Sequence, residues 1–454
     1  MFHFKIDLLK DNILKALLLF AFPILIANIF QQLYNTMDTM IVGNFLGDTS
    51  LAAISACGAV YELLIGFALG VGNGLSIVTA RNYGSNDENQ IKKSVAGSIV
   101  IGIGLTLLIM LISLLFLYPL LQLLHTPIHI IDEAYSYIFV VTIFVGVMFA
   151  YNLCAGLLRA IGNSVMPLIF LIISSLINVG LDILLITQFA MGVQGAAVAT
   201  VISQAISVIL CIFYIYKKTP ILIPCREHFT VDKGLYKELL GQGFSMGFMM
   251  SIVSAGTVIL QSAINDFGYL IIAGHGTARK LNSFCMMPAG TIGLALSTFV
   301  SQNKGANQQQ RIRDGGVRYG NLIACAWGGA LITVILFFGA PLLVQLISGS
   351  REPTVIDNAT LYLRINAPFY AVLGILLNLR NSLQGLGMKI IPLVSSVIEC
   401  LGKIVFVALF IPVLHYFGVI ICEPVIWCCM CLQLAWSFYH NPYIKGAKNN
   451  QETV

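Results

Sequence analysis

The chain alternates long apolar runs with short polar segments, a pattern that predicts about twelve membrane-spanning helices. About 20 apolar residues, at roughly 1.5 Å rise per residue, cross the hydrocarbon core of a bilayer, and every run reaches that length. The expected spans are residues 14–43, 50–80, 93–120, 130–156, 165–188, 193–216, 238–266, 269–301, 316–347, 357–379, 390–413 and 417–440. The predicted fold class is therefore an all-α polytopic membrane protein.

The longest polar connection, residues 217–237, lies near the middle of the chain. It contains Pro220, Pro224 and five basic residues, a composition typical of a linker. The pattern therefore predicts an N-lobe of six helices over residues 1–216, a cytoplasmic linker, and a C-lobe of six helices over residues 238–454.

An internal repeat supports two pseudo-symmetric halves. Shifting the first half by 221 positions pairs identical residues, several of them in two matching polar loops. The pairs are Asn44/Asn265, Gly47/Gly268, Ala52/Ala273, Gly72/Gly293, Leu75/Leu296, Ser76/Ser297, Asn82/Asn303, Gly84/Gly305 and Asn86/Asn307. An even number of spans in each half makes the repeats parallel. In transporters built this way, the substrate site lies between halves that alternate their opening.

Composition fits this interpretation. Hydrophobic residues make up 58% of the chain and charged residues 10%, against about 25% charged in a soluble domain. The net charge of +5 is dispersed over loops, which indicates a membrane topology and no nucleic-acid partner. No small-residue cleavage site follows the first apolar run, so we expect a retained first helix. Most of the eleven cysteines lie in apolar segments, and the cluster Cys428, Cys429 and Cys431 has no ligand histidine nearby. We therefore expect the cysteines to pack within membrane helices rather than to bind a metal.

Lysine and arginine gather in one set of loops, including residues 217–237. The opposite set holds Arg351, with Arg364 nearby. Cytoplasmic loops retain basic residues, so both termini are expected in the cytoplasm and the protein in the cell membrane.

The stretch 31–47 carries an acid, Asp38, in the outer part of the first predicted helix. No basic residue lies between Lys15 and Arg81 to neutralise it. A carboxylate in a lipid-crossing segment costs about 2.5 kcal/mol or more, so such a group normally faces a cavity and has a function. Asp38 therefore predicts a proton or cation site inside a transporter. The alternative is a helix-end carboxylate that only contacts water.

Several blocks resemble the multidrug and toxic compound extrusion (MATE) family. They are QQLYNTMDTMIVGNFLG followed by LAAIS, then GLLRAIGNSVMP and NVGLDILLI, and the resemblance extends over essentially the whole chain. It implies twelve helices in two lobes and cation-driven export of bulky, often cationic organic compounds. The chain is more similar to the DinF-like branch, which carries its essential carboxylates in the N-terminal half. NorM-like members also use acids in the seventh and tenth helices, where this chain has none in 241–265 and has Arg364 instead.

The resemblance carries ion-coupling roles onto Asp38, Asn178 and Asp182. Asp182 lies about 15 residues after Pro167, or roughly 22 Å along its helix, which places it in the outer half of the membrane. Asn178 precedes Asp182 by one turn and shares its face. Two carboxylates and an amide can bind Na⁺ through oxygens, and repulsion between carboxylates can equally favour binding of H⁺. The alternative for Asp182 is a structural hydrogen-bond acceptor.

Further polar residues near these acids are candidates for the substrate cavity. Tyr34, Gln31 and Asn35 can complete the network around Asp38. Glu62 lies about eleven residues into the second predicted helix and is a candidate contact for a cationic substrate.

The C-lobe contains charges of both signs: Arg279, Lys280, Glu399, Lys403 and Glu423. Glu399 and Lys403 are four residues apart on one helix face, in the favourable order. We expect these five to form a buried charge network, because an unpaired charge in the membrane is prohibitive. The N-lobe spans carry only acids, so the cation should be captured there. The alternative is that Glu399 or Glu423 is a second proton carrier.

The leading functional hypothesis is a secondary antiporter that exports amphiphilic organic cations in exchange for H⁺ or Na⁺. The alternative is a flippase for lipid or lipid-linked saccharide of the same two-lobe architecture. An integral-membrane enzyme is disfavoured, since no paired-aspartate or H-E-x-x-H motif is present. A two-fold repeat that carries its acids in one half gives little reason to expect a channel. We expect a monomer whose partners are a small organic substrate and the lipid bilayer, with no cofactor beyond the coupling ion.

Overall fold

The computed structural model describes residues 6–123 and 126–449, and within those ranges the chain forms helices and no strands. Eleven helices are long and apolar enough to cross a membrane, and a bent pair makes a twelfth span. The pair is α6 (Ile128–Ile143) and α7 (Val145–Ala160), which meet at 48°. The predicted all-α membrane fold with about twelve spans is therefore confirmed.

The chain divides into two compact units. Among the described residues, those of 6–7 and 22–251 belong to the first unit, and those of 8–21 and 252–449 belong to the second. These boundaries differ from those of the expected lobes at both ends. Two continuous helices, α1 (Ile13–Leu46) and α10 (Lys233–Asn265), each run from one unit into the other. The polar connection after residue 216 belongs to the first unit.

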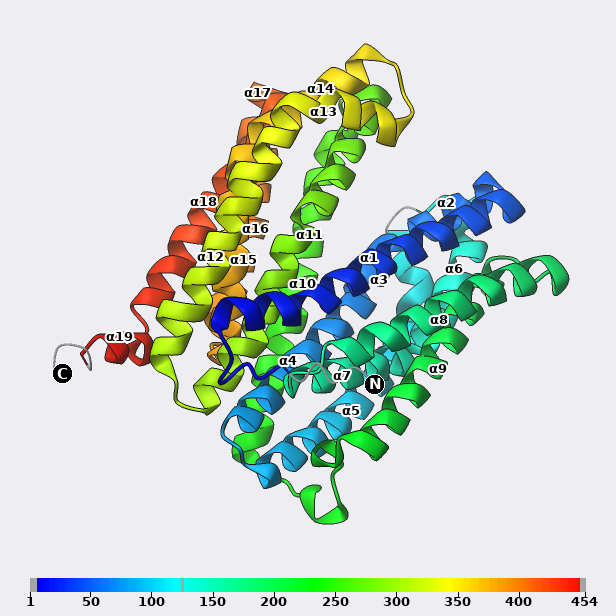
Figure 1. The fold of residues 1–454 in the computed structure, drawn as a ribbon. Coiled ribbons are helices and arrows are strands. Elements are labelled where there is room, and N and C mark those ends of the chain that lie inside the picture. The colour runs from blue at the N-terminus through cyan, green and yellow to red at the C-terminus, as the bar shows by residue number, and fades with distance from the viewer. Residues whose placement is uncertain (1–5, 124–125, 450–454) are drawn as a thin grey trace. The chain divides into compact units, whose positions relative to one another are not determined.

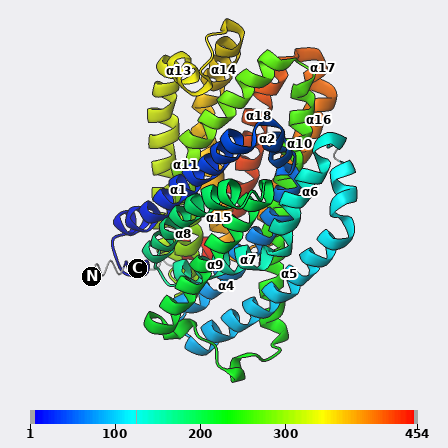
Figure 2. The same ribbon diagram turned by 90° about the vertical axis from the view of Figure 1, so that its right-hand side faces the viewer.

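The first unit is a bundle in which α4 packs on α5 and α7, and α9 packs on α6, α7 and α8 (Figures 1 and 2). Besides α1, α6, α7 and α10, its elements are α2 (Asp48–Ala56), α3 (Gly58–Tyr61), η1 (Glu62–Gly66), α4 (Phe67–Gly84), α5 (Glu88–Leu123), α8 (Val165–Ile183), η2 (Leu184–Gln188), α9 (Val193–Lys218), η3 (Pro220–Leu222) and η4 (Arg226–His228). The predicted span over residues 50–80 is broken before η1, so only Glu62–Gly84 is long and apolar enough to cross.

The second unit is centred on α11, which packs against α14 and α15, and α15 packs in turn on α18 (Figure 1). Its elements are α11 (Tyr269–Gly305), η5 (Arg311–Val317), α12 (Arg318–Ala324), η6 (Cys325–Ile332), α13 (Thr333–Ser348), α14 (Pro353–Asn366), η7 (Ala367–Phe369), α15 (Tyr370–Gly385), α16 (Ile390–Val405), η8 (Phe406–Phe410), α17 (Ile411–Leu414), α18 (Tyr416–Tyr439) and α19 (Pro442–Asn449).

The repeat found in the sequence also appears in the backbone. Gly47 and Gly268 both precede a helix with φ near +90°, at 86° and 89°. Asn86 and Asn307 occupy the left-handed region at 58° and 55°, each in the turn that follows a long helix. Asparagine and glycine tolerate this region better than other residues. The 221-residue shift therefore pairs positions with the same local geometry.

Close glycine packing fixes α4 against α10 inside the first unit. A Cβ built on Gly70 would lie 2.7 Å from the Met246 carbonyl oxygen, and one on Gly74 would lie 2.7 Å from the Cα of Gly243. The reverse side of the contact is Gly247, where a Cβ would lie 2.8 Å from the Phe67 ring. Two glycines four residues apart on each helix let the backbones approach, as is common between membrane helices.

Candidate functional site

The two acids of the first unit lie on α1 and α8. Pro23 lies inside α1 and leaves one backbone hydrogen bond unmade, which permits a bend on the N-terminal side of Asp38. Asp182 is at the end of α8, directly before the π-helical turn η2. Such turns interrupt the regular hydrogen-bond ladder and are frequent at functional sites. Asp182 is fully buried and Asp38 is half-buried.

The carboxyl groups of Asp38 and Asp182 lie within hydrogen-bonding reach of each other. Two ionised carboxylates at this separation repel each other strongly when water is excluded. The pair is therefore stable only when a proton is shared between them or a cation lies beside them. The structure thus brings together two residues that the sequence singled out separately.

Asn178 and Tyr34 join the acid pair through Thr200 on α9. The Tyr34 hydroxyl and Thr200 Oγ1 are hydrogen-bonded at 3.0 Å, and Asn178 Nδ2 donates to the same Oγ1 at 3.4 Å. Tyr34 also interacts electrostatically with both acids. Thr200 was missed in the sequence, where it is one small residue among many in an apolar helix. Only the packing of α8 on α9 reveals it.

The site has a surplus of buried acceptor oxygens. Asp38 Oδ1, both carboxylate oxygens of Asp182, and Asn178 Oδ1 have no hydrogen-bond donor among the described residues, leaving aside a proton shared by the acids. A buried acceptor oxygen is stabilised by a donor or a positive charge, so a cluster of four suits a proton or a cation. Carboxylate and amide oxygens are the ligands that hard cations prefer. The arrangement can therefore hold a proton or a small cation.

Two further tyrosines lie near Asp38 and Tyr34, and both were missed in the sequence. Tyr137 on α6 interacts electrostatically with Asp38 and Tyr34, and Tyr61 at the end of α3 interacts with both tyrosines. Their rings make this part of the unit apolar while their hydroxyls remain available as hydrogen-bonding groups.

The other candidates of the first unit lie outside this cluster. Gln31 Nε2 reaches Asn35 Oδ1 at 3.5 Å on the exposed side of α1, and no contact to the acids is found for this pair among the described residues. Glu62 is exposed at the first position of η1. The proposal that Gln31 and Asn35 complete the network around Asp38 is therefore not supported by the geometry.

In the second unit, Glu423 on α18 is the centre of a buried group. Arg279 on α11 forms an ion pair with it, and the Tyr362 hydroxyl donates to its Oε2 at 2.7 Å. The ring of His275 packs edge-on against Tyr362 at 5.1 Å between centroids. Glu423 is 6% exposed and Arg279 neutralises its charge, so we interpret this group as a structural ion pair.

A second charged group lies on α15 and α16. Lys403 Nζ lies 3.0 Å from Glu399 Oε1, and Arg380 reaches the other oxygen of Glu399 at 3.6 Å. Arg380 lies one residue beyond the expected span 357–379, yet it is buried on α15. Lys403 also interacts electrostatically with Glu423, which links the two groups.

Lys280 is the exception among the five residues expected in this network. Its side chain is exposed, and no acid among the described residues pairs with it. Consecutive residues of a helix point about 100° apart, so Lys280 cannot share the face that Arg279 presents to Glu423. Its assignment to the buried network was wrong.

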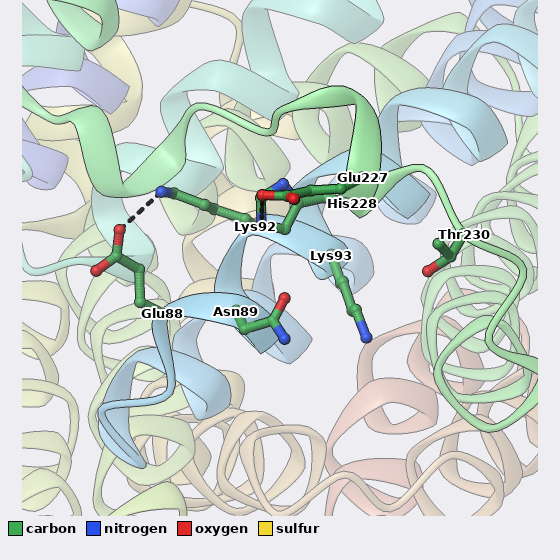
Figure 3. A pocket seen from close by; sticks show the side chains of 7 residues that line it. All are labelled: Glu88, Asn89, Lys92, Lys93, Glu227, His228 and Thr230. Atoms are coloured by element: carbon green, nitrogen blue, oxygen red, sulfur yellow. Dashed lines mark ion pairs between the residues drawn. The ribbon is translucent and has the colours of Figure 1, made fainter.

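An open pocket of about 540 Å³ lies on the first unit, beside the start of α5 and the turn η4 (Figure 3). It is lined by Glu88, Asn89, Lys92, Lys93, Glu227, His228 and Thr230. Lys92 pairs with Glu88 at 2.7 Å.

Near this pocket, Cys225, Glu227 and His228 are close enough together to suggest a metal site. However, the backbone N–H of Cys225 donates to His228 Nδ1 at 3.0 Å. The neutral ring then carries its proton on Nε2, which leaves no lone pair for a metal. The pocket is therefore a solvated surface rather than a second functional centre.

Comparisons with known proteins agree on one family. The family model described as MatE matches residues 23–184 and 246–409. The chain is 30% identical over 341 residues to the probable multidrug resistance protein YoeA of Bacillus subtilis, covering 74% of this chain and 73% of that protein. It is 28% identical over 395 residues to the probable multidrug resistance protein YpnP of the same organism, covering 87% of each.

The fold is likewise shared with solved structures. A crystal structure of MATE in the bent conformation superposes with a TM-score of 0.88 at 20% identity, covering 98% of this chain and 99% of that one. At this identity the likeness concerns the fold alone.

Proposed function

The chain belongs to the MATE family of multidrug efflux transporters, and within that family we propose that it is a cation-driven antiporter. It exports amphiphilic, often cationic organic compounds by alternating access, in exchange for a cation bound at Asp38, Asn178 and Asp182. Its location is the cell membrane, with both termini cytoplasmic, in agreement with the distribution of basic residues over the loops. The flippase alternative is not favoured by the similarities found.

The observation that carries this proposal is the acid pair with its unsatisfied oxygens. A single shared proton satisfies the two carboxyl groups but leaves Asn178 Oδ1 without a donor. A sodium ion can be coordinated by side-chain oxygens of Asp38, Asp182 and Asn178 together. The excess of acceptors therefore favours Na⁺ as the coupling ion, with H⁺ as its competitor for the same carboxylates.

The charge distribution supports coupling in the first unit. In the second unit, each buried acid already has a basic partner: Glu423 has Arg279, and Glu399 has Lys403 and Arg380. An acid neutralised in this way has little affinity for a further cation. Asp38 and Asp182 of the first unit form no ion pair with a basic residue among the described residues.

The test is efflux of a cationic dye from proteoliposomes under a Na⁺ gradient or a pH gradient, imposed separately. Wild type is compared with Asp38→Asn and Asp182→Asn, and with Asp132→Asn, which removes an exposed carboxylate from α6. We expect both pair variants to lose gradient-driven efflux and the control to retain it. Wild-type rates in Asp38→Asn under both gradients would refute the coupling assignment.

A further inference from the structure

Lys280 is a charged residue that neither the proposed coupling site nor the buried ion pairs use. It lies 280 − 269 = 11 residues after the start of α11 at Tyr269, or about 17 Å along the helix axis. This places it inside the apolar span, where an ionised side chain facing hydrocarbon is strongly unfavourable. Its ammonium group therefore requires a polar environment on the exposed face of α11.

The exposed face around Lys280 differs from a lipid-facing surface. Its exposed positions are small, polar or aromatic: Gly276, Ser283 and Phe284. The exposed positions of α13 in the same unit are bulky and apolar, as lipid contact requires, for example Phe338 at 78% and Leu346 at 72%.

There is also room beside Lys280. No atom of the described residues lies within 4 Å of a Cβ built on Gly276. Gly276 precedes Lys280 by one turn on the same face. Phe284, which is 49% exposed, follows Lys280 by one turn, so the two residues lie about 6 Å apart along the helix axis on neighbouring positions of one face. A cation and a flat apolar surface are thus presented side by side.

From this arrangement we infer that Lys280 and Phe284 bind the anionic end of the transported compound. The inference rests on the proposed function and specifies its substrate class. The compound is an amphiphile with a carboxylate, sulfonate or phosphate group next to an aromatic ring. The ion pair between Arg279 on α11 and Glu423 on α18 fixes the direction of Arg279, so that the next residue along α11 points away from that contact.

The experiment compares binding of two matched ligands to the purified transporter in phosphatidylcholine nanodiscs. One ligand is a zwitterionic fluoroquinolone, and the other is its methyl ester, which retains the ring and the amine but lacks the anion. Lys280→Gln is expected to weaken binding of the acid by on the order of tenfold and to leave the ester unchanged. Lys280→Arg should restore binding of the acid. Lys218→Gln, which removes an exposed lysine at the end of α9, is the matched control and should change neither.

Equal affinity of wild type and Lys280→Gln for the acid would overturn the inference, and so would an equal loss for acid and ester. Repeating the measurement with phosphatidylglycerol in the nanodisc distinguishes the source of the anion. If phosphatidylglycerol weakens binding of the acid in wild type but not in Lys280→Gln, the site binds a lipid headgroup and the inference is overturned. If phosphatidylglycerol leaves binding of the acid unchanged, the site binds the organic acid, as inferred. Because binding is measured without a gradient, this result is independent of the coupling test on Asp38.

Discussion

The carboxyl group of Asp38 on α1 lies within hydrogen-bonding reach of that of Asp182 on α8, deep inside the first unit of the transporter. Thr200 on α9 adds hydrogen bonds to Tyr34 and Asn178 at the same place. The proposed ion site is thus assembled from residues of three helices. Its properties depend on how those helices pack as much as on the acids themselves.

Competition between H⁺ and Na⁺ is the first consequence. A cation binds these carboxylates in their ionised form, whereas a shared proton neutralises one of them. Sodium affinity should therefore fall as the pH is lowered, by up to roughly tenfold per pH unit once the shared proton is bound. Calorimetric titration with Na⁺ at several pH values between 8 and 6 measures this change in sodium affinity. The same Na⁺ affinity at both ends of that range would contradict a shared site.

Removing the hydroxyl of Thr200 should weaken the site without removing a charge. Thr200→Val keeps the shape of the side chain but loses the hydrogen bonds to Tyr34 and Asn178, so Na⁺ affinity should fall about fivefold. Thr200→Ser should retain most of it. Thr142→Val is the control, since the hydroxyl of Thr142 bonds only to backbone carbonyls of its own helix. If both valine variants behave alike, Thr200 has no special part in ion binding.

The pair Lys403 and Glu399 should matter for stability and little for coupling. Lys403→Met leaves Glu399 with Arg380 alone and should lower the free energy of unfolding by about 3 kcal/mol. The double variant Lys403→Met with Glu399→Gln removes both charges and should recover part of that loss. Thermal unfolding in detergent and the ion dependence of dye efflux are measured together. A changed ion dependence with unchanged stability would move the coupling site into the second unit.

Packing of α4 on α10 should be intolerant of added side chains. Gly74→Ala places a methyl group against the backbone of Gly243, which cannot move aside as a side chain does, so we expect a loss of about 2 kcal/mol. Gly104→Ala adds the same methyl group on α5, where nothing lies within 4 Å, and should change stability by less than about 0.5 kcal/mol. Unfolding midpoints of the two variants provide the comparison. Equal midpoints would mean that α4 and α10 do not pack this closely.

The helices could be predicted because span length and hydropathy are local properties of the chain. The break before η1 and the bend between α6 and α7 were missed, since neither interrupts the apolar composition. The acids Asp38 and Asp182 were found because a charge in an apolar run is conspicuous. Thr200 was not, because a threonine in a helix of small residues is ordinary.

The sequence by itself determined that the protein is a membrane bundle built from two similar halves, with its unpaired acids in the first. Long apolar runs can be buried in few ways other than as membrane-spanning helices. A carboxylate within such a run costs too much free energy to be there without a function. Only the tertiary structure decided which polar groups meet: Asp182 with Asp38, Glu423 with Arg279, and Lys280 with no acid in the part of the chain that the structure describes. The physical reason is that helix rotation is set by packing contacts between residues distant in sequence, and a rotation of about 100° decides whether a side chain enters the site or leaves it.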